Sequence, residues 1–297
     1  MKVLVTGGSG RIGFKLIKKL ISADVDISSI SMNNDVPLAN IKKFTFDLSD
    51  KEKTNSCINA IKPNIIIHAA ALTNVDVCEK DRWMAYSQNV TSTQNIIDAS
   101  KEINAKIVFV SSSFVFNGRD KIFTEDSEPN PINYYGETKR LSEEIVKSSN
   151  LEYLILRTDQ PYGRIEPWQK DDNVRRVLNK FSRETQLTEP EDWYNNPTYL
   201  DDFVDAAIEL LNRNRRGIYN LVGPDFINRY DWALRISEIF GKDKNMVRPV
   251  NSSYFNLSAK RPISNVSNNK IQIELNRKFR NVIAGLNDIK STIHLPN

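Results

Sequence analysis

Apolar and polar positions follow two different periods at the start of the chain. Residues 3–5 are apolar and uncharged, which is typical of a strand buried on both faces of a sheet. Ile12, Leu16 and Leu20 then recur every four residues, which predicts a helix with a single apolar face. The chain is therefore expected to begin with a strand that leads directly into a helix.

Strand-like and helix-like patterns continue to alternate through the first half of the chain. Further strands are expected at 25–30, 43–46, 64–68, 106–110 and 152–156. Further helices are expected at 83–102 and 135–149. Another is expected to begin at a capping box of Ser49 and Glu52 and to run to about residue 61. Alternation with short connections predicts an α/β fold, a Rossmann-type doubly wound parallel sheet.

Three glycines separate the first expected strand from the first helix. Gly7, Gly10 and Gly13 are spaced Gly-x-x-Gly-x-x-Gly, with a first gap one residue longer than in the common dinucleotide fingerprint. Gly7 and Gly10 would let the backbone turn and approach phosphates, and Gly13 would let the helix pack closely on the sheet. The helix N-terminus would direct its free N–H groups at a pyrophosphate. An ordinary tight turn is the alternative.

The alternation loosens after about residue 163, where helical patterns remain at 173–183, 201–212, 230–240 and 284–291. We expect a dinucleotide-binding Rossmann domain over 1–163 and a smaller α/β lobe, mainly substrate-binding, over 164–297. The boundary is soft, because the chain can cross back to the first domain after residue 195. The smaller lobe is expected to close over the carboxyl ends of the strands, where open α/β sheets bind ligands.

Composition excludes several classes of protein. The net charge of +4 over 297 residues and the lack of a long basic run do not favour nucleic-acid binding. Cys57 and Cys78 have no metal-site spacing, and two histidines make a histidine-based metal site improbable, so we assign no metal. We find no signal peptide and no apolar run of membrane-spanning length, so we expect a cytoplasmic protein without a membrane partner.

Tyr135 and Lys139 lie four residues apart at the start of an expected helix, so they share one face. About 0.8 such pairs are expected by chance from this composition, so the pair matters only because of its position. It follows Ser112, which lies just past the carboxyl end of an expected strand. Reduction of a ketone needs an acid, and a nearby lysine would lower the pKa of the phenol. The Ser112 hydroxyl would hold the carbonyl oxygen beside it.

These motifs resemble the extended short-chain dehydrogenase/reductase superfamily. The matching residues are 6–13, Asp47-Leu48, 68–71, Asn89, Ser112 and the Tyr135/Lys139 pair. Within the superfamily the chain is similar to the dTDP-4-dehydrorhamnose reductase group nearly from end to end. That similarity rests on residues 73–79, 115–118, 135–139, 157–163, 196–202 and 260–270.

The resemblance implies a role for each matching residue. Catalysis would fall to Ser112, Tyr135 and Lys139, and the last two would also contact the cofactor. The dinucleotide would be held by Gly7, Gly10, Arg11, Ile12, Gly13, Ser31, Asp47, Leu48, Ala69, Ala70 and Ala71. The substrate would be held by Thr73, Val75, Ser113, Phe114, Gln160 and Arg261. Arg261 would face a diphosphate, or alternatively form a salt bridge between the lobes.

The end of the second expected strand bears on the choice of cofactor. It reads Ser31-Met32-Asn33-Asn34 and has no acid before Asp35 to accept the ribose 2′-hydroxyl of NAD. Arg11 offers a positive charge nearby. We therefore favour NADP, with NAD possible. The alternative is that Arg11 is solvated and that Asp35 reaches the ribose.

Two departures from the reductase group stand out. Ser112-Ser113 replaces its usual Thr-Asp, so the acid after the catalytic hydroxyl is missing and dehydration is disfavoured. Asp159-Gln160 replaces its Ser-Trp, which leaves the identity of the sugar open. Elsewhere, we expect His68 to be structural, Trp83 and Trp232 to lie in the core, and Asn89 to be a polar position near the site or on the helix surface.

Three hypotheses of function remain. The first is an NADP-dependent reductase of a nucleotide-activated 4-keto-6-deoxysugar, as in dTDP-rhamnose biosynthesis. The second is a sugar-nucleotide 4-epimerase that retains NAD. The third is a non-catalytic NADP-binding subunit resembling the regulatory subunit of methionine adenosyltransferase. The expected partner is a nucleotide-diphosphate sugar, and a homodimer is left open.

Overall fold

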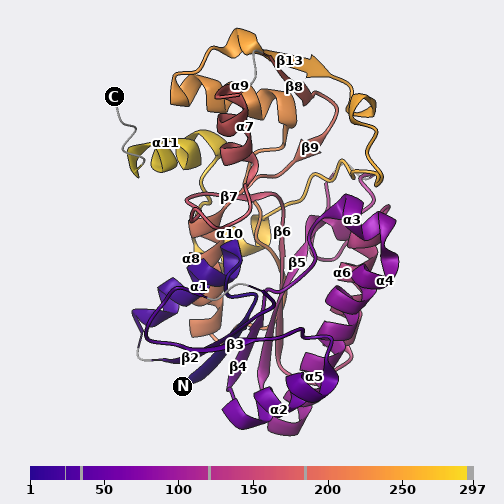
Figure 1. The fold of residues 1–297 in the computed structure, drawn as a ribbon, viewed down its shortest axis with the longest axis vertical. Coiled ribbons are helices and arrows are strands. Elements are labelled where there is room, and N and C mark those ends of the chain that lie inside the picture. Colours follow the sequence, from indigo (N-terminus) through magenta and orange to yellow (C-terminus); the bar gives the residue numbers. More distant parts are fainter. Residues whose placement is uncertain (24, 34–35, 120–121, 184–185, 293–297) are drawn as a thin grey trace.

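A seven-stranded parallel sheet forms the centre of the molecule, in the order β11-β6-β5-β4-β1-β2-β3 (Figure 1). The computed structural model describes residues 1–23, 25–33, 36–119, 122–183 and 186–292. The strands are β1 Lys2–Thr6, β2 Asp26–Ser31, β3 Lys42–Thr45, β4 Ile65–His68, β5 Lys106–Ser112, β6 Tyr153–Thr158 and β11 Gly217–Asn220. The predicted doubly wound α/β fold is confirmed.

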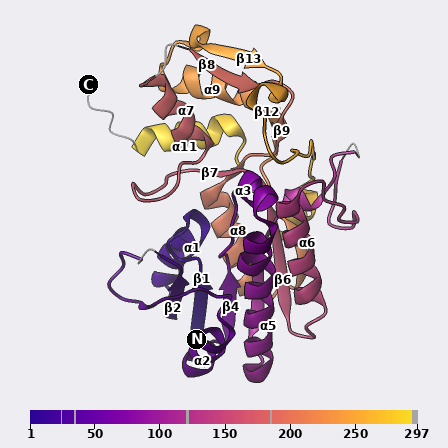
Figure 2. The same cartoon turned by 45° about the vertical axis from the view of Figure 1, so that its right-hand side comes forward.

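Helices cover both faces of this sheet, as Figure 2 shows. On one face lie α1 Arg11–Ile21, α8 Leu200–Asn212 and α10 Asn269–Leu275. On the other lie α2 Lys51–Ile61, α5 Ser92–Ile103 and α6 Tyr134–Lys147. Burial on both faces accounts for the uncharged apolar sequence of the central strands.

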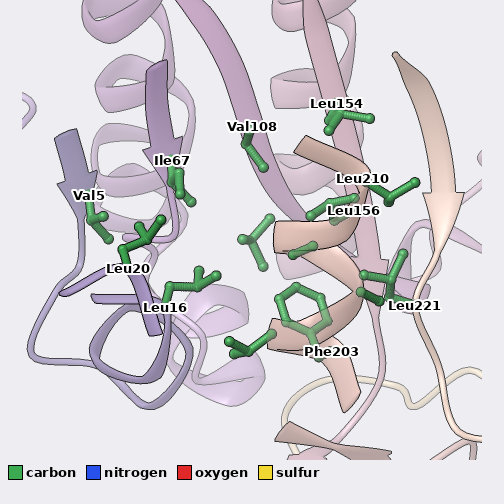
Figure 3. Close-up of a cluster of buried hydrophobic side chains, with 14 of the residues drawn as sticks. Val5, Leu16, Leu20, Ile67, Val108, Leu154, Leu156, Phe203, Leu210 and Leu221 are labelled. Carbon is green, nitrogen blue, oxygen red and sulfur yellow. The ribbon is translucent and has the colours of Figure 1, made fainter. Parts of the chain in front are cut away.

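Side chains of β1 alternate between two apolar clusters, one on each face of the sheet. Val5 packs with Leu16 of α1 and Phe203 of α8 in the first cluster (Figure 3). Leu4, one residue earlier, packs with Ile58 of α2 in the second cluster. The helix pattern read from the sequence therefore places α1 on the sheet as expected.

A second lobe lies beyond the carboxyl ends of the strands (Figure 1). Its helices are α7 Asn173–Phe181, α9 Arg229–Phe240 and α11 Val282–Thr292, packed around Trp232. Three two-stranded sheets lie in this lobe or beside it. They are β7 Pro161–Tyr162 with β10 Thr198–Tyr199, β8 Leu187–Pro190 with β13 Val247–Val250, and β9 Tyr194–Asn195 with β12 Ile227–Asn228.

The chain crosses between the lobes more than once. After β10 it returns through α8 to β11, which pairs with β6, and α10 later packs on this side too. The division into domains at residue 163 stays a prediction. No helix in the described ranges is long and apolar enough to span a bilayer.

One local prediction is wrong, and another is confirmed with an added detail. Asp50, not Ser49, caps α2 by accepting the backbone N–H of Lys53 at 3.1 Å. The Ser49 N–H is bonded to Asp47, so it is not available to Glu52 as the capping box requires. The helix expected at 83–102 is present as α4 Arg82–Tyr86, a π-helical turn Ser87–Thr91 and α5, which follow one another without a break.

That π-helical turn also decides where Trp83 lies. A π turn inserts extra residues per turn, so the face before it is rotated relative to the face after it. Trp83 is consequently 81% exposed, and its assignment to the core is wrong, whereas Trp232 is fully buried as expected. The short helix α3, Val75–Lys80, was not predicted.

Candidate functional site

The turn between β1 and α1 packs closely against the residues that follow β4. Gly7 has a φ of +70°, and a Cβ there would lie 2.7 Å from the Ala70 backbone nitrogen. A Cβ on Gly13 would lie 2.3 Å from the Gly7 carbonyl oxygen, so the helix rests directly on the turn. Both glycines are therefore required by backbone contacts, as the motif predicted.

The N-terminus of α1 has the features of an anion site. Its N-cap is Gly10, no side chain of the described residues caps it, and its first turn carries no acid. Arg11 is half-buried, and its guanidinium donates to the Pro161 carbonyl oxygen at 3.1 Å. Burial lowers the pKa of Arg11. Arg11 is thus not a solvated surface side chain, and free N–H groups with a nearby cation fit a pyrophosphate.

The other residues assigned to the dinucleotide lie at neighbouring strand exits. Ser31 ends β2 and accepts the Ser9 N–H at 3.2 Å, which helps to shape the glycine turn. Asp47 follows β3 and accepts from Gln88 at 2.8 Å. Ile12 lies in the first turn of α1, while Leu48 and Ala69–Ala71 follow β3 and β4. Asp35, the alternative ribose ligand, lies outside the described residues.

Ser112, Tyr135 and Lys139 are brought together at the exit of β5. Ser112 is the last residue of β5, and its hydroxyl accepts the Phe114 N–H at 3.2 Å. Asn133 caps α6 by accepting the Gly136 N–H at 2.8 Å, which fixes Tyr135 in the first turn. The Phe114 ring packs edge-on against Tyr135 with centroids 5.8 Å apart. All three catalytic candidates are buried.

The pKa of the Tyr135 phenol differs from the lowered value that the sequence predicted. Burial raises the pKa of Tyr135 above its usual range, although a hydrogen bond with Ser112 opposes the rise. Lys139 donates to the Val110 carbonyl oxygen at 2.9 Å, and burial lowers its pKa to about 8. The expected lowering of the phenol pKa by Lys139 is therefore not found. Without a ligand, the phenol holds its proton firmly.

A buried ion pair holds α6 in place. Arg157 of β6 donates to both carboxylate oxygens of Glu143, at 2.9 and 2.7 Å, and Ser111 donates to the same carboxylate at 2.6 Å. Tyr135, Lys139 and Glu143 follow at intervals of four residues on one helical face. Glu143 was not predicted, although this spacing in the sequence is a signal for it.

Asp159 stands where β6 leaves the sheet and was not predicted as a site residue. It is 3% exposed, and its Oδ2 accepts the Asn196 N–H at 2.8 Å. Burial raises its pKa to about 6, while the Asn196 N–H, the Ser113 hydroxyl and the Arg229 charge oppose the rise. Thr158, one residue before Asp159, pairs with Ser112 in the register of β5 and β6, so Asp159 lies at the exit of β6 next to the end of β5. Its charge also contributes to the raised pKa of Tyr135.

Two arginines flank Trp193 beside this carboxylate. The guanidinium of Arg229 lies 4.5 Å from the Trp193 ring centroid, and that of Arg261 lies 5.1 Å away. Arg229 donates to Gln160 Oε1 at 2.6 Å, and Gln160 has a left-handed φ of 38°. Burial lowers the pKa of Arg229 to about 9. Within the described residues Arg229 forms no ion pair.

Arg261 spans the two lobes. It pairs with Asp76 of α3 at 2.5 Å, which is the contact expected of an interlobe salt bridge, yet its Nε is buried without a hydrogen-bond partner. The remaining substrate candidates follow three neighbouring strands. Thr73 is exposed after β4, Val75 opens α3, Ser113 and Phe114 follow β5, and Gln160 follows β6.

Polar atoms without partners gather in this interlobe region. Seven of them are buried yet have no hydrogen-bond partner among the described residues, namely Thr158 Oγ1, Asp159 Oδ1, Trp193 Nε1, Asn195 Oδ1, Arg229 Nε, Arg261 Nε and Ser264 Oγ. Each such atom costs free energy when buried unpaired. A polar ligand with both donors and acceptors would satisfy this set.

Two other polar residues are structural. His68 bonds to Thr6 at 2.7 Å and Thr93 at 3.1 Å, and burial lowers its pKa to about 3, as expected of a neutral core histidine. Asn89, in the π-helical turn, binds the Leu72 backbone with both its side-chain oxygen and nitrogen. Asn89 therefore anchors the segment after β4. The described residues contain no cluster of three or more potential metal ligands.

Comparison with known proteins links this geometry to a family. The chain matches the family described as RmlD substrate binding domain over residues 1–293. It is 28% identical to a dTDP-4-dehydrorhamnose reductase of Aggregatibacter actinomycetemcomitans, covering 79% of this chain and 78% of the relative. It is 26% identical to methionine adenosyltransferase 2 subunit beta of Xenopus tropicalis, covering 84% and 75%.

The fold is also found among solved structures. A dTDP-4-dehydrorhamnose reductase from Bacillus anthracis, in complex with NADP, superposes with a TM-score of 0.87 at 26% identity. The superposition covers 98% of each chain. Both lobes therefore have counterparts in that structure.

Proposed function

Because the chain belongs to the RmlD substrate-binding domain family, we propose that it is an NADP-dependent reductase. Its substrate would be a nucleotide-activated 4-keto-6-deoxysugar, reduced at the keto group as in dTDP-rhamnose biosynthesis. The observation that carries this proposal is the buried Ser112–Tyr135 pair, with Lys139 one helical turn further on. Methionine adenosyltransferase beta subunits are similar at comparable identity, so the reaction itself has to be tested.

The glycine turn and the uncapped start of α1 would hold the pyrophosphate of the cofactor. When bound, the reduced dinucleotide supplies the hydride for the keto carbon. The relative from Bacillus anthracis that binds NADP supports this choice of cofactor. Arg11 would add positive charge beside the phosphates.

Tyr135 would give its proton to the oxygen that becomes the alcohol. Its raised pKa means that the phenol enters the reaction protonated at neutral pH, as an acid in the reductive direction must. Ser112 would donate to the same oxygen and hold it beside the phenol. Lys139 would contact the bound dinucleotide; in the structure it donates to the Val110 carbonyl oxygen and is not among the groups that lower the phenol pKa.

The diphosphate of the sugar nucleotide would lie against Arg229 and Arg261. Both guanidinium groups have a buried Nε without a partner, and phosphate oxygens are the acceptors that such groups prefer. Arg229 forms no ion pair with any described residue, whereas Arg261 is partly neutralised by Asp76. Arg229 is therefore expected to contribute more to binding. A homodimer stays a prediction.

The direct test follows NADPH oxidation at 340 nm on addition of dTDP-4-keto-6-deoxysugar. Tyr135→Phe should lower turnover by roughly 10²- to 10⁴-fold, because the general acid is lost, and leave NADPH affinity unchanged. Tyr134→Phe, one residue earlier and outside the trio, is the matched control and should keep full turnover. A Tyr135→Phe protein with normal turnover would contradict the assignment.

A second candidate is a non-catalytic NADP-binding subunit, favoured by the similarity to methionine adenosyltransferase beta subunits. The intact trio of Ser112, Tyr135 and Lys139 argues against it. NADPH binding without oxidation by any keto-sugar, together with stoichiometric copurification with a partner enzyme, would support it instead. Retention of NAD through gel filtration, with interconversion of sugar nucleotides and no net oxidation, would identify an epimerase.

A further inference from the structure

The carboxylate of Asp159 is placed between the reacting centre and the second lobe. Its backbone accepts the Thr198 N–H at 3.0 Å, and its Oδ2 accepts the Asn196 N–H at 2.8 Å. These bonds fix the side chain against the segment that follows β9. Such a constraint leaves Asp159 little freedom to choose another partner.

The second oxygen of this carboxylate has no hydrogen bond of good geometry, although the Ser113 hydroxyl and the Asn195 side chain lie close enough to lower the Asp159 pKa. Asp159 Oδ1 is fully buried, and no hydrogen bond within the described ranges satisfies it. An unpaired carboxylate oxygen in a buried site is costly, so the fold would be expected to pair it if the site served stability alone. The nearby Thr158 Oγ1 and Asn195 Oδ1 are unpaired as well.

Charged and titratable groups around Asp159 come from three helices. Arg229 of α9 lies on one side, and Tyr135 of α6 carries the phenol on another. Ser113, in the turn after β5, and Asn195 of β9 contribute neutral side chains. Cys78 of α3 also acts on the phenol but carries no charge at neutral pH, since burial raises its thiol pKa to about 11. A second carboxylate, Glu189 of β8, acts on the Arg229 charge and is itself paired with Arg176.

We propose that Asp159 accepts a hydrogen bond from a hydroxyl group of the sugar ring, next to the keto carbon that is reduced. This inference rests on the proposed function and adds to it a specificity residue for the sugar. A buried carboxylate oxygen without a hydrogen bond, one residue beyond the strand position that pairs with Ser112, can accept a donor from a ligand. A ring hydroxyl supplies such a donor, whereas an ionised diphosphate carries none. The substrate is therefore a keto-sugar with a free hydroxyl adjacent to its keto group.

The test compares the affinity of the protein for dTDP and for dTDP-rhamnose by calorimetry. The gain contributed by the sugar is the ratio of the affinity for dTDP-rhamnose to the affinity for dTDP. This gain should fall roughly 10- to 100-fold in Asp159→Asn, since hydrogen bonds to charged groups are stronger than those between neutral groups. Affinity for dTDP itself should stay unchanged. Asp172→Asn is the matched control, because Asp172 is a buried carboxylate that likewise accepts backbone N–H groups but caps α7.

A second readout uses the wild-type protein alone. The gain contributed by the sugar should decline as the pH falls below about 6, where the carboxyl of Asp159 takes up a proton, and the decline should be absent in Asp159→Asn. His68 does not titrate in this range, because burial holds its pKa at about 3. The pH profile therefore separates a direct role of the carboxylate from a general loss of structure.

The possible outcomes distinguish the two proposals. An Asp159→Asn protein that keeps the full gain from the sugar would overturn the role of Asp159 and leave the reductase assignment intact. Equal loss of affinity for both ligands would also overturn it, because the residue would then act on the fold. A wild-type protein that gains nothing from the sugar and oxidises no NADPH would overturn the proposed function together with this inference.

Discussion

Two charged side chains lie two residues apart at the end of β6, and their surroundings are opposite. Arg157 is fully buried, and Glu143 binds it through two hydrogen bonds. Asp159 is almost as buried, yet one of its oxygens has no partner and its pKa is raised to about 6. Arg157 is paired with an opposite charge, whereas Asp159 forms no ion pair within the described residues.

This difference separates a structural role from a binding role. A buried charge that forms an ion pair within the fold links elements to one another, here α6 to the sheet, even though Arg157 Nη1 has no hydrogen-bond partner. A buried charge without an opposite charge bonded to it destabilises the free protein. Buried polar atoms without partners continue from Asp159 to Arg229 and Arg261, which is why the proposed substrate site lies at the interlobe surface.

The largest effect on stability is expected from breaking the structural side of this comparison. Glu143→Ala leaves the Arg157 charge buried without compensation, which should lower the free energy of unfolding by about 3–5 kcal/mol. Urea denaturation measures this difference. Glu238→Ala, in an exposed pair with Arg235, is the control and should cost at most about 1 kcal/mol. Similar small losses in both variants would mean that the buried pair is not a structural link.

The next largest effect concerns Asp159, whose substitution should raise the free energy of unfolding rather than lower it. Because its pKa is higher in the folded state, about 6 against a reference value of 3.8, the folded protein binds the proton more tightly. The contribution of Asp159 to the free energy of unfolding is then most favourable below about pH 4 and is lost as the pH rises through about 6. Asp159→Asn should therefore stabilise the ligand-free protein by about 3 kcal/mol at pH 7.5, with the gain shrinking toward pH 4.

Thermal unfolding of both proteins across this pH range checks the expectation. Asp50→Asn is an informative control, because Asp50 caps α2 and a hydrogen bond with Lys53 lowers its pKa, so its contribution runs in the opposite direction with pH. An Asp159→Asn protein that is less stable at pH 7.5 would show that the carboxylate is part of the structural network, and the contrast with Arg157 would fail.

Local sequence patterns predicted the parts of the site that depend on the backbone. Gly7 and Gly13 were assigned from their spacing and their place between an apolar strand and an amphipathic helix, and the close backbone contacts at both positions agree with that role. The Tyr135 and Lys139 pair was assigned from its helical spacing and its place after β5. In each case the determining contacts lie within one strand–turn–helix unit, so the order of residues along the chain is sufficient.

The interlobe residues depend on contacts that no local pattern encodes. Arg229, Trp193 and Asp159 meet only because the chain crosses repeatedly between lobes. Asp159 differs from the residue usual in the reductase group, but the sequence does not show that its side chain is buried or which residues surround it. Trp83 was misplaced for a related reason, since the π-helical turn that rotates its face leaves no clear signal in the apolar spacing.

The smallest expected effect concerns Arg229 and tests how far the unpaired region extends. Arg229→Met keeps the length of the side chain against Trp193 but removes the charge, so affinity for dTDP should fall roughly 10-fold. Stability of the ligand-free protein should rise rather than fall, because burial disfavours this charge and lowers the pKa of Arg229 to about 9. Arg235→Met, on the exposed side of the same helix, should leave dTDP affinity unchanged. Unaltered dTDP affinity in Arg229→Met would instead mark Arg229 as a structural cation between Trp193 and Trp232, and would confine the binding region to Asp159 and Arg261.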